Sequence, residues 1–486
     1  YGGKILEFKY DNEAKGLKIE VLEKVAEYSF AGTLKEHLST IPYEIIPGPL
    51  PTFRCCVYKE REIIRERLIS ACGNCLPNQP SDKVLCVLPA ACEGCPISRY
   101  RVTDNCQRCL AHRCKGACHF GAITINPKGA YIDPKKCKEC GQCAAACPYN
   151  AISDTMRPCR RSCPVNAIGR DKYNRTVIDY DRCISCGACL RACPFGAITD
   201  RSQIVPIIDL LKSETPVTAV FAPAIEGQFG KATIGMIKNA LKKLGFTDAV
   251  EVSLGADATA AHEAHELKDA IAKGEKLTSS CCPAFVEMVE KHFPKLEGNV
   301  SSTASPMTAV ARYIRMLNPK TKIVFIGPCV AKKLEIIKRK DTADYVLTFE
   351  ELEAMFRAKK INAEEAAEDS QDGSRAGKNF AQSGGVAGAV QEVLKEEHYD
   401  KPVTTVRCNG SNECRKTLMI MNAGRLPQNF VEGMACEGGC IAGPASVETL
   451  RGIKRNRAAL VAKADNRTVL ENVNEIHDFS KVNMTR

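Results

Sequence analysis

The 486-residue sequence contains no tryptophan, and only 6% of its residues are aromatic. It also lacks an apolar run of the roughly 18 residues that a membrane-spanning helix requires, and no secretory signal opens it. We therefore expect a cytoplasmic protein that does not contact the membrane. The 44% hydrophobic content is enough for two or three domains, each with its own core.

Cysteine, in contrast, is abundant, with 28 residues. Disulfide-rich scaffolds are usually short secreted chains, whereas this chain has the length of an enzyme. Many of its cysteines fall in Cys-x-x-Cys runs, which are typical of metal sites in a reducing compartment. The sequence therefore predicts metal binding in place of disulfides.

The formal net charge of +11 counts every cysteine as neutral. A four-iron cube with four thiolate ligands carries a net charge of about −2 when oxidised, because ligating thiols are deprotonated. Three or four such cubes cancel most of the positive excess, so we predict no nucleic-acid partner. A local basic face for docking an acidic electron carrier remains compatible with the charge.

Cysteine density divides the chain into three predicted regions. Residues 1–100 hold seven cysteines in loose pairs, residues 101–203 hold fourteen in tight runs, and residues 204–486 hold seven in four short places. We interpret them as an N-terminal region, a ferredoxin-like multi-cluster domain of α+β type and a C-terminal catalytic domain.

The middle region contains iron–sulfur motifs. Two runs match the bacterial ferredoxin pattern, in which three close cysteines hold one cube and the fourth, followed by Pro, serves another. The zinc alternative usually needs only two Cys pairs, without the third close Cys or the Pro. The two runs, a looser third run and half a motif are Cys137/Cys140/Cys143/Cys147-Pro148, Cys183/Cys186/Cys189/Cys193-Pro194, Cys106/Cys109/Cys114/Cys118 and Cys159/Cys163-Pro164.

A short signature follows each of these motifs and indicates a repeated ferredoxin half-domain: Gly121-Ala-Ile, Asn150-Ala-Ile, Asn166-Ala-Ile and Gly196-Ala-Ile. Fourteen cysteines suffice for three 4Fe-4S cubes with two left over. We predict cubes on Cys106/Cys109/Cys114, Cys137/Cys140/Cys143 and Cys183/Cys186/Cys189. The crossing fourth ligands come from Cys118, Cys147, Cys163 and Cys193, and the sequence leaves their pairing open.

The N-terminal cysteines give a weaker signal. Cys72-x2-Cys75, Cys86 and Cys92-x2-Cys95 fit an extra metal site, either a cluster or a zinc, but also fit buried thiols without metal. Cys55 and Cys56 are adjacent, so they cannot easily ligate one small site together.

The C-terminal region has an α/β pattern. Strand-like apolar runs at 217–221, 249–253, 322–326, 344–348 and 403–406 alternate with helical patterns such as 234–244 and 258–273. This alternation predicts parallel or mixed sheets covered by helices. The polar stretch 364–378 is predicted to be an exposed loop.

Three motifs of this region resemble the active-site motifs of FeFe hydrogenases, in the same order and at similar intervals. They are Thr278-Ser-Ser-Cys281-Cys282-Pro283, Gly327-Pro328-Cys329-Val-Ala-Lys332-Lys333-Leu-Glu335 and Met434-Ala-Cys436-Glu-Gly-Gly-Cys440. The resemblance covers about residues 130 to 445 and implies a two-lobed domain that catalyses H2 = 2 H+ + 2 e−.

The resemblance also implies a cofactor, the H-cluster. A 4Fe-4S cube would be held by Cys282, Cys329, Cys436 and Cys440, and Cys440 would bridge it to a di-iron centre with carbon monoxide, cyanide and a dithiolate that carries an amine. Lys332 corresponds to the donor to one cyanide, and the backbone at Ala222-Pro223-Ala224 approaches the other. Met434 corresponds to a residue that lines the pocket.

Cys281 corresponds to a proton relay of the family and not to a ligand. A thiol suits this role because its environment can tune it to donate or accept a proton. Glu263 and Glu266 are separated by one helical turn and so share a face, and Ser301 takes the position of the hydroxyl between them. The implied proton path runs from solvent through Glu266, Ser301, Glu263 and Cys281 to the metal. His262 and His265 are predicted to be surface residues without a role.

Several departures suggest a divergent branch similar to the family's group B, namely Gly327, Ala284-Phe285, Met307 and Ala442-Gly443-Pro444. The resemblance implies ferredoxin or a similar small redox protein as electron partner, maturation proteins that insert the di-iron centre, and an anaerobic cytoplasm. The alternatives are a hydrogen sensor and an iron–sulfur electron-transfer or assembly protein. The direction of turnover and any role of Cys408 and Cys414 stay open.

Overall fold

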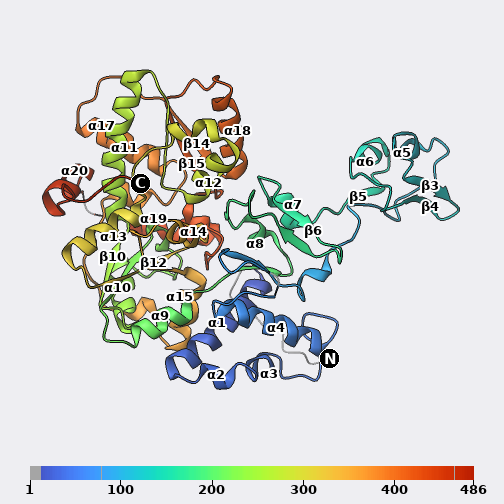
Figure 1. Cartoon of the computed structure of the whole chain (residues 1–486), viewed down its shortest axis with the longest axis horizontal. Coiled ribbons are helices and arrows are strands. Elements are labelled where there is room, and N and C mark those ends of the chain that lie inside the picture. Colours follow the sequence, from blue (N-terminus) through green and yellow to red (C-terminus); the bar gives the residue numbers. More distant parts are fainter. Residues whose placement is uncertain (1–11, 78, 465) are drawn as a thin grey trace.

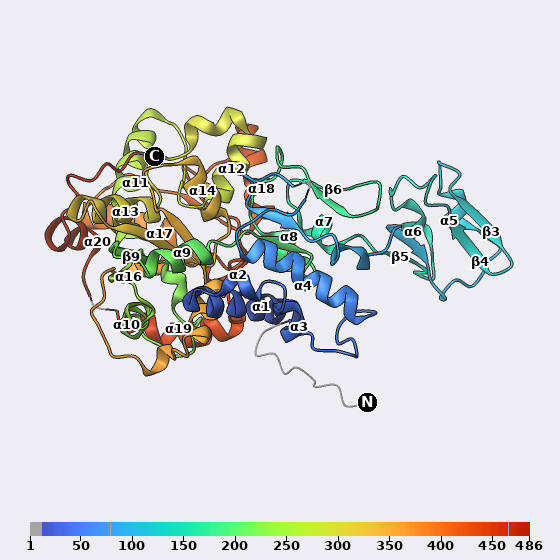
Figure 2. The same ribbon diagram turned by 60° about the horizontal axis from the view of Figure 1, so that its bottom comes forward.

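The computed structural model describes residues 12–486 except residues 78 and 465. Figure 1 shows three parts: a large body built from the C-terminal region, N-terminal helices against one side of it, and a small unit that projects away from both. The view in Figure 2 shows the same projection of the small unit.

The first lobe of the large body is built on a four-stranded parallel sheet. Its strand order is β10-β9-β12-β13, with β10 at Asp248–Glu251, β9 at Val217–Phe221, β12 at Lys322–Gly327 and β13 at Tyr345–Thr348. These strands are nearly continuous apolar runs because helices cover both faces of such a sheet. The surrounding helices are α9 (Ile204–Leu211), α10 (Ile234–Leu244), α13 (Pro306–Leu317), α14 (Ala331–Lys338) and α15 (Phe349–Ala358).

The second lobe contains a three-stranded parallel sheet, ordered β11-β15-β14. Its strands are β11 (Leu277–Thr278), β15 (Phe430–Met434) and β14 (Thr405–Asn409). The helices of this half are α11 (Ser253–Lys273), α12 (Pro283–His292), α16 (Arg375–Asn379), α17 (Gly385–Glu396), α18 (Ser411–Asn422) and α20 (Val469–Glu471), whereas α19 (Leu450–Val461) packs in the core of the first lobe. The predicted two-lobed α/β architecture with parallel sheets is confirmed.

Most local predictions for this region hold, some with shifted bounds. Residues 217–221 and 234–244 form β9 and α10 as predicted, whereas α11 begins five residues earlier than expected. The prediction of an exposed loop at 364–378 is wrong for its second half. Lys378 is only 1% exposed, and its ammonium lies 2.7 Å from a carboxylate oxygen of Glu251. The ion pair with Glu251, a residue distant in the sequence, therefore keeps Lys378 buried although the residues around it in the sequence are polar.

The middle region has the predicted ferredoxin-like α+β form, with short helices and antiparallel strand pairs. The helices that carry cysteines are α5 (Arg113–Gly116), α6 (Gln142–Ala146), α7 (Pro158–Ser162) and α8 (Ala188–Ala192). The strand pairs are β1 (Leu85–Val87) with β8 (Ile198–Asp200), β2 (Tyr100–Val102) with β5 (Ile152–Asp154), β3 (Ile123–Asn126) with β4 (Gly129–Ile132), and β6 (Ile168–Arg170) with β7 (Thr176–Ile178).

These elements form two units with separate cores. Residues 100–154 are named the inner unit because in the sequence they lie between the two segments of the other unit. Ile123, Ile132 and Cys143 of the inner unit pack around Tyr100, and this unit is the part that projects in Figure 1. The outer unit consists of residues 84–95 and 157–200, on either side of the inner unit in the chain, and packs against the large body. The paired strands β2 and β5 lie at the junction.

The repeated short signature has a backbone explanation. Gly121, Asn150, Asn166 and Gly196 have φ angles of 60°, 48°, 52° and 56°. This left-handed conformation favours Gly and, among other residues, Asn. The signature therefore marks the turn that follows the last cysteine of each motif.

The N-terminal region is helical, with α1 (Glu13–Ala31), α2 (Leu34–His37), α3 (Ile41–Ile45) and α4 (Val57–Ala71). Apolar residues of α1 share one core with the first lobe. The ammonium of Lys18 also lies 2.6 Å from both Asp200 and Glu350. Among the helices of the described residues, none is both long and apolar enough to cross a bilayer.

Candidate functional site

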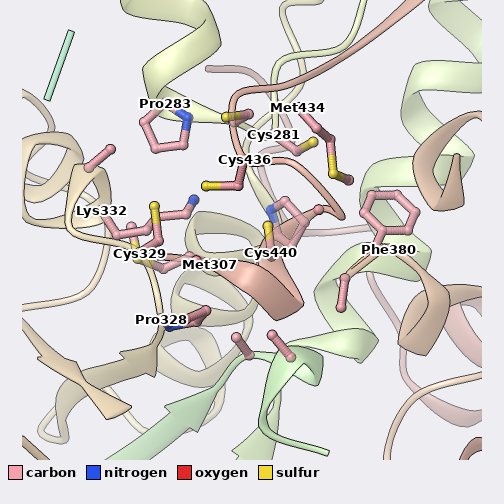
Figure 3. Close-up of a pocket in the computed structure, with 18 of the residues that line it drawn as sticks. Cys281, Pro283, Met307, Pro328, Cys329, Lys332, Phe380, Met434, Cys436 and Cys440 are labelled. Atoms are coloured by element: carbon pink, nitrogen blue, oxygen red, sulfur yellow. The ribbon is translucent and has the colours of Figure 1, made fainter. Parts of the chain in front are cut away.

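A cavity lies where the two lobes meet. Figure 3 shows the side chains of Cys281, Cys329, Cys436, Cys440 and Lys332 around it. The other predicted site residues that line it are Cys282, Pro223, Ala224 and Met434, together with Cys186 of the outer ferredoxin unit. The structure thus brings the three motifs and the turn after β9 to one place.

Strand topology explains this convergence. Cys281 and Cys282 follow β11, Cys329 follows β12, and Cys436 and Cys440 follow β15. Because ligands of open parallel sheets bind beyond the carboxyl ends of the strands, loops from both sheets can supply one site. Cys282 is also the N-cap of α12, with Pro283 at the first helical position.

Burial makes these thiols weak acids on their own. It raises the pKa of Cys329 to about 11, the neighbouring Cys282 adds to this shift, and Lys332 opposes it. Burial also raises the pKa values of Cys436 and Cys440 well above the usual thiol range. Thiols in such surroundings become thiolates when a metal supplies compensating positive charge.

The donor set fits a cube better than a single ion. In the described residues, no three His, Cys, Asp or Glu side chains converge closely enough for one metal ion. Four cysteines from three loops nevertheless line a single cavity. Thiolates spread over such a space suit a multi-iron cluster, which is larger than one ion.

Lys332 is 7% exposed and lies at the cavity wall. Its ammonium donates to the hydroxyl of Ser305 at 3.0 Å and to the carboxylate of Glu335 at 2.6 Å. An ammonium has three donors, so these partners orient Lys332 and leave a further donor for a ligand. Glu335 belongs to the second motif, but no pattern in the sequence assigns it this role.

The predicted relay residues lie near one another, although Oε2 of Glu263 accepts no hydrogen bond in the described part of the chain. The Glu263 carboxylate is fully buried and accepts from the backbone N–H of Ser280 at 3.0 Å, and the Ser280 hydroxyl oxygen lies 3.2 Å from the same carboxylate oxygen. Ser301 donates to Glu266 at 2.5 Å. Burial raises the pKa of Glu263 to about 7, the Glu266 carboxylate adds to this, and Ser280 and Ser301 oppose it. Ser301 therefore stands between the two carboxyl groups.

Cys281 lies at the cavity end of this group of residues. Burial raises the pKa of its thiol well above the usual value, and the carboxylate of Glu263 adds to the shift. The thiol therefore holds its proton at neutral pH. A neutral thiol between a cavity and a carboxyl group can pass a proton in either direction.

Two further residues of this group were missed by the sequence interpretation. The hydroxyl of Ser280 donates to the Thr303 carbonyl at 2.7 Å, and the Thr303 hydroxyl donates to Glu266 at 3.2 Å. For Ser280, its position next to Cys281 is the only sequence signal of this role, and Thr303 has no such signal. The prediction that His262 is a surface residue is wrong, because it is half-buried and lies 2.7 Å from the Thr303 hydroxyl. His265 is exposed as predicted.

In the ferredoxin units, cysteines of neighbouring runs lie close to one another. In the inner unit, a small cavity is lined by Cys118 from one run and by Cys137, Cys140 and Cys143 from the next. Conversely, Cys147 from the second run lies near Cys114 of the first run. Burial raises the pKa of Cys114, and the nearby Cys147 and Cys106 raise it further. Cys109 is half-buried on the loop between Cys106 and α5.

In the outer unit, Cys163 lies beside the run Cys183, Cys186 and Cys189. Burial raises the pKa of Cys186 to about 12, and the nearby Cys183, Cys163 and Cys282 add to it. Cys186 also lines the large cavity. This run therefore lies next to the cavity between the lobes.

The remaining thiols are scattered. Cys55 is exposed, Cys56 and Cys72 flank α4, and Cys86 lies in β1. Cys408 and Cys414 are buried next to each other, and Cys414 donates to the carbonyl of Met434 at 3.4 Å.

The chain resembles known proteins along most of its length. Residues 215–444 match the family described as "Iron only hydrogenase large subunit, C-terminal domain", and residues 130–153 and 176–199 match "4Fe-4S binding domain". Iron hydrogenase 1 of Clostridium pasteurianum is 31% identical over 70% of this chain and 69% of its own length. The chain belongs to the iron-only hydrogenase family.

Other relatives are more distant. The large subunit of the periplasmic Fe hydrogenase of Nitratidesulfovibrio vulgaris is 26% identical over 51% of this chain and 71% of its own. Among solved structures, an FeFe-hydrogenase studied for oxygen inactivation gives a TM-score of 0.47 at 22% identity, covering 57% of this chain and 93% of its own.

Proposed function

We propose that this protein is an FeFe hydrogenase that catalyses H2 = 2 H+ + 2 e− in the cavity between its lobes. One observation supports the proposal: a half-buried thiol outside the predicted ligand set, Cys281, lies between the cage of four cysteines and the residues Glu263, Ser301 and Glu266. A cluster that only transfers electrons has no need of such a proton path.

The residues of the cavity fit the H-cluster. When bound, the di-iron centre with its carbon monoxide, cyanide and dithiolate ligands supplies the chemistry that splits or forms hydrogen, and its cube exchanges electrons. Cys282, Cys329, Cys436 and Cys440 would hold this cofactor. Lys332, fixed by Glu335, would donate to it, and the turn at Pro223 and Ala224 and the side chain of Met434 would shape the apolar wall.

Protons and electrons would leave in different directions. Cys281 would exchange its proton with Glu263, whose pKa near 7 suits transfer in both directions. Ser301 and Glu266 would continue the path toward solvent. Electrons would pass to the cube on Cys183, Cys186 and Cys189, because Cys186 lines the same cavity.

A basic surface supports the proposal of an acidic ferredoxin-like partner. The inner unit holds eight Lys or Arg residues and four Asp or Glu residues, and all eight cations are exposed. Two of the four acids are already paired with the outer unit, Glu139 with Arg160 and Arg170, and Asp154 with Arg161. The projecting surface is therefore left basic, which favours encounter with an acidic partner. Loading by maturation proteins and an anaerobic cytoplasm stay predictions.

The test begins with infrared spectroscopy. Protein matured with the di-iron centre should show bands of metal-bound carbon monoxide and cyanide, and should evolve hydrogen from a reduced viologen dye. Bands without turnover would favour a hydrogen sensor, and intact cubes without bands would favour an electron-transfer or assembly protein. Cys281→Ala should retain the bands and lose turnover, whereas Cys55→Ser, a change at an exposed thiol, should alter neither.

A further inference from the structure

Of the fourteen cysteines of residues 101–203, two, Cys159 and Cys193, have no place in the three predicted cubes. The run Cys183, Cys186 and Cys189 has its crossing partner in Cys163. By the ferredoxin rule, Cys193 should then serve a second cube of the same unit. The sequence shows no second continuous run here, only Cys159 of the half motif.

The missing ligands come from the other side of the inner unit. The sulfur of Cys92 accepts a hydrogen bond from the backbone N–H of Thr176 at 3.2 Å, and the sulfur of Cys159 lies 3.8 Å from the hydroxyl of the same threonine. Cys92 and Cys159 are 5% and 4% exposed. One residue of β7 thus holds two thiols that are far apart in the sequence.

Cys95 and Cys193 join this pair. A methyl group added to Gly94 would lie 2.6 Å from the ring of Phe195, so the Cys92–Cys95 turn packs directly on the segment that follows Cys193. The sulfur of Cys193 accepts from the backbone N–H of Ala197 at 3.3 Å, as Cys118 and Cys163 accept from the residue four positions later. Cys193 therefore has the geometry of a crossing fourth ligand.

Charge points to an anionic occupant among these thiols. Arg157 is 5% exposed, donates to Thr176 and to the carbonyl of Asn174, and has no carboxylate within ion-pair distance among the described residues. Its Nε is buried without a hydrogen-bond partner in that part of the chain. Burial raises the pKa of Cys95, whereas Arg157 lowers it. A buried cation is costly unless it is compensated, and a cube with four thiolates supplies a charge of about −2.

We propose that Cys92, Cys95, Cys159 and Cys193 hold a further 4Fe-4S cube. The outer unit is then a complete two-cube ferredoxin whose first ligand run is interrupted by another two-cube ferredoxin, residues 100–154. The chain would bind four accessory cubes instead of three. This inference concerns cluster content and does not depend on hydrogen chemistry.

The test counts iron in protein made without the maturation proteins, so that only cubes are present. After anaerobic reconstitution, five cubes give about twenty iron atoms per chain, and Mössbauer spectra should assign all of them to 4Fe-4S clusters. A count of about sixteen, or zinc in the place of the missing iron, would overturn the proposal.

Variants then locate the cube. The double variant Cys95→Ser/Cys159→Ser should lose about four iron atoms, whereas Cys55→Ser, the same chemical change at an exposed cysteine, should lose none. An unchanged iron content in the double variant would refute the assignment.

If the double variant does not fold, Arg157→Gln gives a second measurement. Removing this cation should lower the reduction potential of one cluster, seen by paramagnetic resonance during a redox titration, and leave the other clusters unchanged. Identical titrations of variant and parent would count against the site.

Discussion

Replacing Glu263 by Gln tests the proton path most directly. The amide keeps the shape of the side chain and can still accept from Ser280, but it cannot carry a proton. Because Glu263 is fully buried, no solvent molecule replaces it without rearrangement. The neutral amide also avoids the free-energy cost of burying a charged carboxylate, so we expect no loss of folding stability at neutral pH.

The size of the effect follows from the role of the group. A positioned acid or base typically contributes 10²- to 10⁴-fold, so turnover should fall by about that factor. This corresponds to about 3 to 5 kcal/mol of activation free energy. The pKa of Glu263 is raised to about 7, so the parent carboxyl is protonated below this pH and loses its proton above it. Hydrogen evolution should therefore decline as the pH rises through 7, and this step should vanish in the variant.

The assay is hydrogen evolution with a reduced viologen dye, combined with infrared spectra of the same samples. His265→Gln is the matched control, because His265 lies on the same helix and its side chain is 59% exposed. The control should keep the rate of the parent. Glu263→Gln could instead retain more than about a tenth of the turnover with unchanged infrared bands. A loss smaller than about tenfold is below the range expected for a proton relay, so this result would show that the proposed path is wrong.

Three further changes have definite expected results. Lys332→Met leaves the buried Glu335 unpaired, which should cost about 3 to 5 kcal/mol of stability and reduce the infrared bands of the di-iron centre; unchanged band intensity would show that Lys332 does not help to hold it. Burial raises the pKa of Asp257 to about 7, so its contribution to stability is complete below its usual pKa and is lost as the pH rises through 7, by up to about 4 kcal/mol. Urea titrations should show this slope in the parent and a flatter one in Asp257→Asn, and equal slopes would refute it. Lys135→Glu with Lys136→Glu should slow electron transfer with an acidic ferredoxin at low salt but not with a viologen; equal rates with ferredoxin would move the docking surface elsewhere.

Local signals accounted for much of the fold. The apolar run 217–221 and the helical pattern 234–244 became a strand and a helix at the predicted residues, because both patterns are set by neighbours in the chain. The stretch before Lys378 was misread because its partner, Glu251, is distant in the sequence. Composition records polarity but not which polar groups will be paired.

The same distinction applies to the site. The motifs around Cys281, Cys329 and Cys436 can be recognised from the sequence because the residues of each motif are contiguous, and the structure brings them to one cavity. The pairing of crossing ligands cannot be predicted from the sequence, since each motif has nearly the same spacing. Cys92 and Cys159 could not be joined from spacing at all, because an entire folded unit separates them in the chain.

That interruption also sets an order of assembly. During synthesis, residues 100–154 emerge as one continuous segment, so the projecting unit can fold and take up its cubes while the rest of the chain is still being made. The outer unit must wait for Cys193, the last of its proposed ligands. The cubes farthest from the large body would thus be installed first, and the cluster beside the catalytic cavity would be among the last to close.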